Sequence, residues 1–153
     1  MLGISKKIMV AVDASAVSDK AAYEAVWLAC CQAAKFKNKI FAVFVKADRM
    51  RDYEDLFVKG VSAQDEISER WKKVIEQAFF VIRKLAAEKE ILLETLVVEG
   101  EPAASINHLA RKYDIDLLII GSTGKGAVKR AFLGSVSAEV IEHAPCSVYV
   151  VRA

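Results

Sequence analysis

The glycine-rich segment Gly121–Ser135 has residues whose types and spacing suit the binding of an anion. Its candidate contacts are Gly121, Gly124, Lys125, Gly134 and Ser135. Glycines let backbone N–H groups approach a ligand closely, and the start of a helix adds unpaired N–H donors and the positive end of the helix dipole. Because an apolar helical pattern from Val136 to Ala144 follows directly, the segment predicts a phosphate site where a loop opens a helix.

Other interpretations of this segment stay open. A lone Gly-x-x-Gly is usually an ordinary turn, and a basic loop is usually just solvated. Gly126 follows Lys125 where a P-loop has Ser or Thr, and the spacing does not match a dinucleotide fingerprint either. Ser135 and Ser137 can cap the helix or donate hydroxyls to phosphate. Phosphate charge could be neutralised by the side chains of Lys125, Lys129 and Arg130.

A second candidate, Asp13, directly follows a short apolar run from Ile8 to Val12 that predicts a buried strand. Alone, its simplest role is to cap the next helix, for which Ser15 and Ser18 are also suited. Opposite a phosphate loop, a carboxylate is better suited to accept hydrogen bonds from a base or a ribose, because it would repel phosphate.

The remaining reactive side chains suggest no catalytic or metal site. His108 is expected on the surface of a helix and His143 near the C-terminus of the last one. Neither has a partner at metal-ligand spacing, and no Ser/His/Asp arrangement is indicated. Glu139 is a weak candidate for a base near a γ-phosphate, and an ion pair at the surface is its simpler role. Trp71, Phe79 and Phe80 are expected to pack in the core and not to form a platform on which a base stacks.

The elements that must position these residues alternate between strands and helices. Strands are predicted at 8–12, 40–45, 91–98, 117–120 and 147–151. Helices are predicted between a cap at Ser15 or Ser18 and a break at Lys37-Asn38, at about 62–88, from 102, and at 136–144. A polar, irregular loop is expected from Lys46 to Gly60. Near-continuous apolar strands that alternate with helices predict an α/β fold, a parallel sheet with helices on both faces. Ligands of such sheets bind beyond the carboxyl ends of the strands, where Asp13 and the glycine segment both lie.

Length and composition bound the remaining possibilities. The 153 residues fit one domain over residues 1–153, and 54% hydrophobic residues exclude general disorder. A net charge of +2 does not favour nucleic acid as a partner. No apolar run suggests a signal peptide or a membrane span, and the three cysteines fit reduced thiols, so we expect a cytoplasmic protein.

With these motifs together, the chain resembles the universal stress protein family. The similar segments are Ile8–Ser15, Val97–Pro102, Asp116–Ser122 and, most specifically, Gly121-x2-Gly124-x9-Gly134-Ser135, which agrees with the pattern of the ATP-binding branch. The resemblance covers the whole chain and is weakest from Lys46 to Lys89.

The resemblance implies a three-layer, Rossmann-like sandwich of the adenine nucleotide hydrolase type, with a five-stranded parallel sheet in the order 3-2-1-4-5. It implies ATP, accompanied by Mg²⁺ or Mn²⁺, with Asp13 and the backbone of Val45 at the adenine or ribose. By position in the motif, the ribose and phosphates would be held by Gly121, Gly124, Lys125, Gly134, Ser135, Val136 and Ser137. It also implies a homodimer, and the short apolar strand Ser147–Val151 would need such cover if it lies at an edge. The alternative is a monomer whose edge strand is guarded by Arg152.

Three positions depart from the family pattern. Ala14 stands where glycine usually follows the Asp, Phe44 where a histidine is common, and Ser147 where a proline is common. None removes a phosphate donor, but Ala14 and Phe44 could reshape the base pocket. The main hypothesis is an ATP-binding regulator of stress survival with little or slow hydrolysis. The alternatives are a true ATPase or adenylyl-transferring enzyme, and an interaction scaffold that binds no nucleotide.

Overall fold

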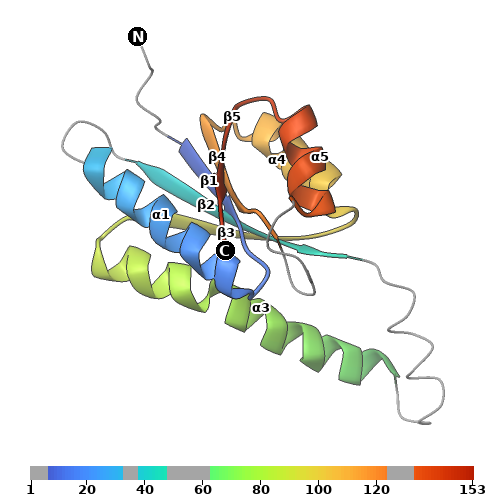
Figure 1. Ribbon diagram of the computed structural model, residues 1–153. Helices are drawn as coiled ribbons and strands as arrows, with labels where there is room; N and C mark the ends of the chain where they lie inside the picture. The colour runs from blue at the N-terminus through green and yellow to red at the C-terminus, as the bar shows by residue number, and fades with distance from the viewer. Residues whose placement is uncertain (1–6, 33–37, 48–62, 124–132) are drawn as a thin grey trace.

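The computed structural model describes residues 7–32, 38–47, 63–123 and 133–153. Strands and helices alternate throughout these residues, as predicted (Figure 1). In chain order they are β1 Lys7–Ala11, α1 Ala16–Gln32, β2 Lys39–Lys46, α3 Ala63–Glu88, β3 Leu92–Glu99, α4 Pro102–Lys112, β4 Leu117–Gly121, α5 Ser135–His143 and β5 Ser147–Val151. The predicted irregular loop lies largely outside the described residues, as do Gly124, Lys125, Lys129 and Arg130.

The strands form one five-stranded sheet in the order β3-β2-β1-β4-β5, and every neighbouring pair is parallel. The expected order 3-2-1-4-5 is therefore confirmed. The direction of winding reverses between β1 and β4, whose pairing runs from Ile8 and Leu117 to Val10 and Ile119. This switch point is the place where a parallel sheet offers a crevice.

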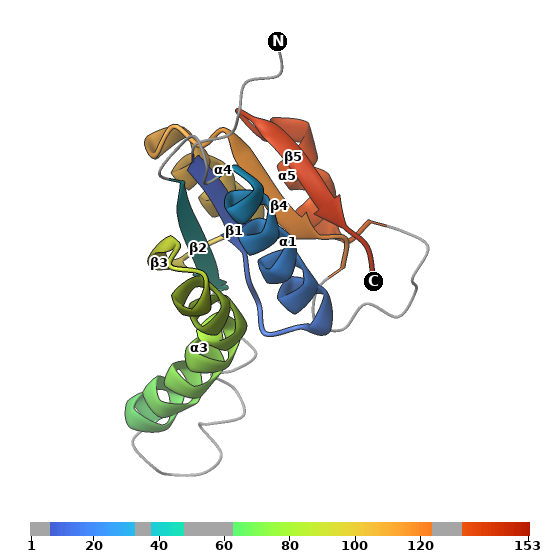
Figure 2. The ribbon, with the colours of Figure 1, turned by 90° about the vertical axis from the view of Figure 1, so that its left-hand side faces the viewer.

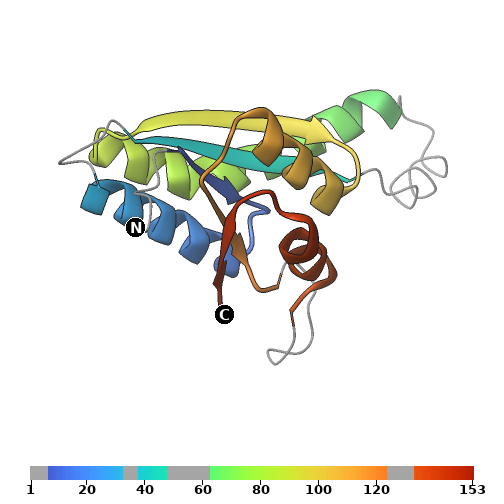
Figure 3. The ribbon, with the colours of Figure 1, turned by 90° about the horizontal axis from the view of Figure 1, so that it is seen from above.

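Helices cover both faces of the sheet (Figure 1; Figure 3). On one face, α1 and α3 bury a cluster that includes Ile8, Val10 and Phe79. On the other, α4 packs through Ile106 and Leu109 against the strands, and α5 contributes Val140 from the same side. Since alternate strand residues point to opposite faces, the near-continuous apolar strands of the sequence are what this double cover requires.

The long helix α3 behaves only in part as predicted. Its apolar stripe packs on the sheet, and Phe79 is fully buried. Phe80, however, is 65% exposed, so the expectation that it packs in the core is wrong. One helical step turns the chain by about 100°, so two adjacent residues cannot both lie at the centre of one apolar stripe. Trp71 is only partly buried where it packs against this cluster.

The other reactive side chains lie as expected. His108 is exposed on α4, and His143 is the last residue of α5. Cys30, Cys31 and Cys146 are all free thiols, and partial burial raises the pKa of the Cys146 thiol. No helix in the described part of the chain has the length and apolarity needed to cross a bilayer.

Candidate functional site

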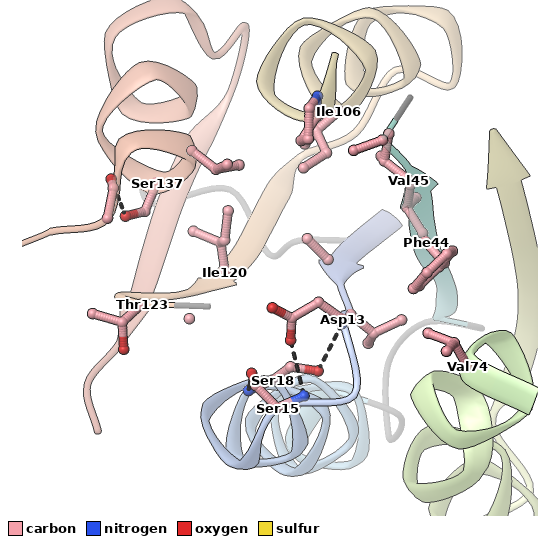
Figure 4. Close-up of a pocket in the computed structure, with 18 of the residues that line it drawn as sticks. Asp13, Ser15, Ser18, Phe44, Val45, Val74, Ile106, Ile120, Thr123 and Ser137 are labelled. Carbon is pink, nitrogen blue, oxygen red and sulfur yellow. Dashed lines mark hydrogen bonds between the residues drawn. The ribbon is translucent and has the colours of Figure 1, made fainter. Parts of the chain in front are cut away.

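A cavity of about 620 Å³ opens at the carboxyl ends of β1, β2 and β4. Seven residues selected from the sequence lie in its wall, namely Asp13, Val45, Gly121, Gly134, Ser135, Val136 and Ser137. Figure 4 shows Ser137 and Thr123 on one side, Phe44, Val45 and Val74 on the other, and Asp13 between them. Residues separated by more than a hundred positions therefore meet at the switch point of the sheet. Gly124 and Lys125 lie outside the described residues.

One end of the cavity, the α5 end, is built around the start of helix α5. Gly134 is the N-cap residue, with φ −66° and ψ 159°, and no side chain hydrogen-bonds the cap among the described residues. The prediction that Ser135 or Ser137 caps this helix is therefore wrong. The Ser137 hydroxyl is instead directed back at the main-chain oxygens of Ser122 (3.0 Å) and Gly134 (2.9 Å). Its proton already has acceptors, so binding phosphate would require the hydroxyl to rotate.

The main chain fixes the start of α5 to the end of β4. Gly134 N–H donates to Ser122 O at 2.7 Å, and the first helical bond runs from Ala138 N–H to Gly134 O at 3.0 Å. The amides of Ser135, Val136 and Ser137 precede that bond and have no carbonyl within the helix to accept them. These residues line the cavity, and the first turn carries no acidic side chain. The positive end of the α5 dipole is thus presented to the cavity.

The two described glycines of the motif differ in what surrounds them. A Cβ on Gly121 would approach Val17 Cγ1 to 2.8 Å, a contact that normal packing does not allow. A Cβ on Gly134 would meet Ser122 O only at 3.4 Å, an ordinary contact, and its negative φ suits any residue. Packing against α1 therefore accounts for a glycine at 121. At 134 neither packing nor backbone conformation requires one, and its absent side chain leaves the start of α5 open.

Asp13 lies in a turn that leads from β1 into α1. Its Oδ1 accepts the Ser15 N–H (3.0 Å), its own N–H donates to Ser18 Oγ (3.1 Å), and Ser18 N–H donates to Ser15 Oγ (3.1 Å). Ser15 is thus the N-cap of α1, as predicted. Ala14 takes φ +62°, a left-handed conformation that costs a non-glycine residue about 1–2 kcal/mol. Burial and the nearby Asp13 charge both raise the pKa of Asp19, on the first turn of α1.

Val45 offers its main chain to the cavity because β2 is longer than β1. Val43 O accepts the Val12 N–H (2.9 Å), and Lys46 O accepts the Gly100 N–H (3.1 Å) on the opposite side. Peptide groups of a strand alternate in direction, so the N–H and C=O of Val45 point to the β1 side, like those of Val43. Since β1 ends at Ala11, they point past its end into the crevice, in the plane of the sheet.

The other end of the cavity, the α3 end, includes residues that sequence reasoning missed. Helix α3 contributes Arg70, Trp71 and Val74 to the wall, and the opposite helix α4 contributes Pro102 and Ile106. The apolar stripe of α3 correctly predicted that Trp71 faces the sheet. It could not show that this turn of the helix lies beyond the end of β1, because periodicity gives a face and not a position along the partner strand.

Metal chemistry has no protein ligand set in the described residues. Within them, no three His, Cys, Asp or Glu side chains cluster closely enough to hold an ion. The arrangement instead offers amide donors at the α5 end, a carboxylate at Asp13 and a strand edge at Val45. These groups suit a ligand with an anionic tail at one end and a flat polar ring at the other.

Comparison with known proteins shows which family has this sequence pattern. A model of the universal stress protein family matches residues 5–152. The chain is 34% identical over 147 residues to universal stress protein MJ0531 of Methanocaldococcus jannaschii, covering 96% of this chain and 82% of that protein. It is 30% identical over 151 residues to universal stress protein YxiE of Bacillus subtilis, covering 95% and 98%.

Solved structures agree in fold. The hypothetical protein MJ0577 superposes with a TM-score of 0.78 at 23% identity, covering 99% of this chain and 98% of that one. A universal stress protein in complex with cAMP gives 0.63 at 20% identity, covering 97% of both chains. A family member from Arabidopsis thaliana with AMP bound gives 0.60 at 22% identity, covering 95% and 90%.

These three structures support the fold alone, whereas the family model and the sequence relatives extend over nearly the whole chain. The chain belongs to the universal stress protein family.

Proposed function

We propose that this protein binds ATP in the cavity at the switch point and acts as a nucleotide-dependent regulator in stress survival. The observation that carries the proposal is the uncapped start of α5, whose first amides lie in the cavity wall. Free amides at a helix N-terminus form a ready anion site, because the unpaired donors and the dipole act together. AMP and cAMP in two proteins of the same fold support an adenine nucleotide as the ligand class.

The geometry of the cavity supports the roles that the family motif implies for its residues. The triphosphate would lie at the α5 end against the main chain of Gly134, Ser135 and Val136. Asp13 would accept hydrogen bonds from the ribose, and the Val45 N–H and C=O would bind the edge of the adenine. Gly124 and Lys125 keep the phosphate role that the motif implies. Mg²⁺ or Mn²⁺ would be held by the phosphate oxygens.

We expect hydrolysis to be slow or absent. Phosphoryl transfer needs a group that orients the attacking water and charge that stabilises the transition state. Asp13 is the one carboxylate among the described residues of the cavity wall, and its Oδ1 already accepts a main-chain N–H. Glu139, the candidate base, is exposed on α5 and does not line the cavity. Binding without such groups favours regulation over turnover.

Calorimetry with ATP and Mg²⁺ tests the proposal. Wild-type protein should bind, and ATP at 100 times its dissociation constant should stabilise the fold by about 2.7 kcal/mol. Gly134→Val should weaken binding about tenfold or more while the ligand-free melting temperature stays near that of wild type, because its side chain would enter the phosphate approach. Ala138→Val adds the same side chain at an exposed α5 position outside the cavity and is the matched control.

No thermal shift at millimolar ATP would favour the nucleotide-free scaffold. Multiple-turnover production of ADP or AMP would favour the enzyme, and mass spectrometry of small molecules carried through native purification would identify a bound ligand directly.

We place the protein in the cytoplasm, where its free thiols would stay reduced.

A homodimer through β5 is part of the same proposal. β5 is an edge strand of the sheet, and Figure 2 shows it at the margin beside the C-terminus. Val151 O accepts the Ser122 N–H (2.7 Å), so by alternation the peptide groups of Val148 and Val150 point outward. An antiparallel copy of β5 would pair with them.

Light scattering should therefore give twice the monomer mass. Val148→Pro, which removes one outward N–H, should shift the mass toward monomer, whereas Val148→Thr keeps that N–H and should stay dimeric. A monomeric wild type at micromolar concentration would contradict the dimer.

A further inference from the structure

Trp71 lies in the wall of the cavity, although the apolar stripe of α3 predicts only a packing role. Its side chain is partly buried and contributes to the α3 end together with Val74. The chain has two tryptophans, and the other, Trp27, is 62% exposed on α1 and does not line the cavity. The two indoles thus have different surroundings, which makes each a control for the other.

Two side chains of β2 hold the Trp71 ring. Phe44 meets it edge to face, with ring centroids 6.0 Å apart and an interplanar angle of 68°. Lys46 Nζ lies 5.5 Å from the ring centroid and also forms an ion pair with Glu99 at 2.6 Å. Edge-to-face pairs and cations near an indole are both favourable arrangements. The indole is therefore positioned by its neighbours before any ligand arrives.

The position of Trp71 relative to Val45 decides what it could contact. The Val45 N–H and C=O point across the crevice in the plane of the sheet. A base bonded to them would continue that plane, with one face toward α3 and the other toward α4. On the α3 side the wall includes Phe44, Trp71 and Val74. Figure 4 shows Phe44 and Val74 on that side of the cavity and Ile106 on the α4 side.

We propose that Trp71 is a specificity-determining residue that covers the α3-side face of the bound base and favours purine over pyrimidine nucleotides. This inference rests on the proposed function, since it assigns a role within the same nucleotide site. Aromatic contact with a base grows with the area of the base, so a two-ring base gains more from Trp71 than a one-ring base. Contacts of this kind typically change affinity by about tenfold when the aromatic residue is replaced by alanine.

Fluorescence tests the contact without removing Trp71. In Trp27→Phe, Trp71 is the one remaining tryptophan, and saturating ATP should change its emission strongly. In Trp71→Phe, Trp27 remains and its emission should not respond. If the emission of Trp71 stays the same while calorimetry shows the protein saturated with ATP, the proposed contact does not exist.

Affinity tests the specificity. Trp71→Ala should lose about tenfold in affinity for ATP but less than about threefold for CTP, so that the preference for ATP falls. Trp27→Ala is the matched control and should change neither affinity. Equal losses for ATP and CTP would indicate a structural role and would overturn the inference, as would unchanged affinities.

If wild-type protein binds no ATP at all, the proposed function fails and the inference fails with it. If wild type binds and Trp71→Ala behaves like Trp27→Ala, only the inference fails.

Discussion

Two helices on the same face of the sheet begin at the cavity, and their first turns differ. The start of α4 is closed by its own side chain, because the Glu101 carboxylate accepts the amides of Ala103 (3.1 Å) and Ala104 (2.6 Å). The start of α5 has Gly134 at the same position and no such bond among the described residues. Both Pro102 and Gly134 line the cavity. Of the two described termini on this face of the sheet, one is therefore open to an anion and the other is already neutralised.

The difference shows how helix capping can direct a ligand within one cavity. A capped terminus stabilises the protein by about 1 kcal/mol, whereas an uncapped terminus keeps its donors for a ligand. On this explanation, adding a cap to α5 should weaken anion binding without lowering the stability of the fold. Removing the cap of α4 should lower that stability.

Gly134→Asp would give α5 the type of cap that α4 has. The backbone of Gly134 is extended, φ −66° and ψ 159°, which is the conformation of an N-cap residue, and its Cβ has room. The new carboxylate should keep or slightly raise the melting temperature of the free protein. It should weaken ATP binding by roughly 3 kcal/mol, about a hundredfold, because like charges would meet at the cap.

Gly134→Asn is the matched control, since it offers a cap of the same shape without the charge. Calorimetry on both variants should show a far smaller loss of affinity for the Asn variant. Equal losses would mean that bulk rather than charge excludes the phosphates, and unchanged affinity in both would place the anion elsewhere.

Gly121→Ala tests whether Gly121 is needed for close packing of β4 against α1. Its Cβ would lie 2.8 Å from Val17 Cγ1, so the sheet and α1 would have to separate. Overpacking of this size typically destabilises a fold by about 1–3 kcal/mol. Chemical denaturation should show this loss, and Val17→Ala combined with Gly121→Ala should lose less than the two single variants together. Strict additivity would rule out the contact as the cause.

The fold was predictable because its signals are local. Each strand is a short apolar run, and α3 was predicted at 62–88 and begins at Ala63 and ends at Glu88. Alternation of strands with helices is enough to predict a parallel sheet covered on both faces, without any tertiary information. The strand order itself came from the resemblance to a family, because five alternating strands are compatible with more than one winding.

Site residues that belong to a local sequence motif could be predicted. Residues that reach the cavity only through tertiary packing could not. Gly121, Gly134 and Asp13 directly follow strands or open a helix, so their neighbours in the chain indicated the cavity. The cap of α5 was predicted wrongly because Ser135 and Ser137 are good capping types. The structure begins the helix one residue earlier and directs the Ser137 hydroxyl at carbonyl oxygens. Trp71 reaches the cavity only through the packing of α3.

Glu101→Ala opens the α4 terminus. Loss of a capping side chain should destabilise the fold by about 1 kcal/mol, measured as a lower midpoint in urea with an unchanged slope. Glu142→Ala removes an exposed carboxylate from α5 and should change the midpoint by less than about 0.5 kcal/mol. An equal effect of the two variants would mean that the amide contacts of Glu101 contribute no net stability.

The smallest expected effect concerns a third helix that begins at the cavity, α1, whose first turn carries Asp19. Burial, followed by the charge of Asp13, raises the pKa of this carboxyl. The folded state therefore holds the Asp19 proton more tightly than the unfolded state does. As pH rises through and above the ordinary Asp pKa, ionisation of Asp19 lowers the free energy of unfolding, and the loss is complete once pH exceeds the raised value.

Asp19→Asn should remove this pH-dependent loss in the free energy of unfolding. Its melting temperature relative to wild type should rise from about pH 3 to neutral pH and then stay level, with the total change a small one because Asp19 is largely solvated. The favourable interaction of a carboxylate with the N-terminus of α1 acts in the opposite direction. If the relative melting temperature falls with rising pH, the helix dipole outweighs burial and the Asp13 charge together, and the carboxylates near α1 stabilise its start as Glu101 stabilises that of α4.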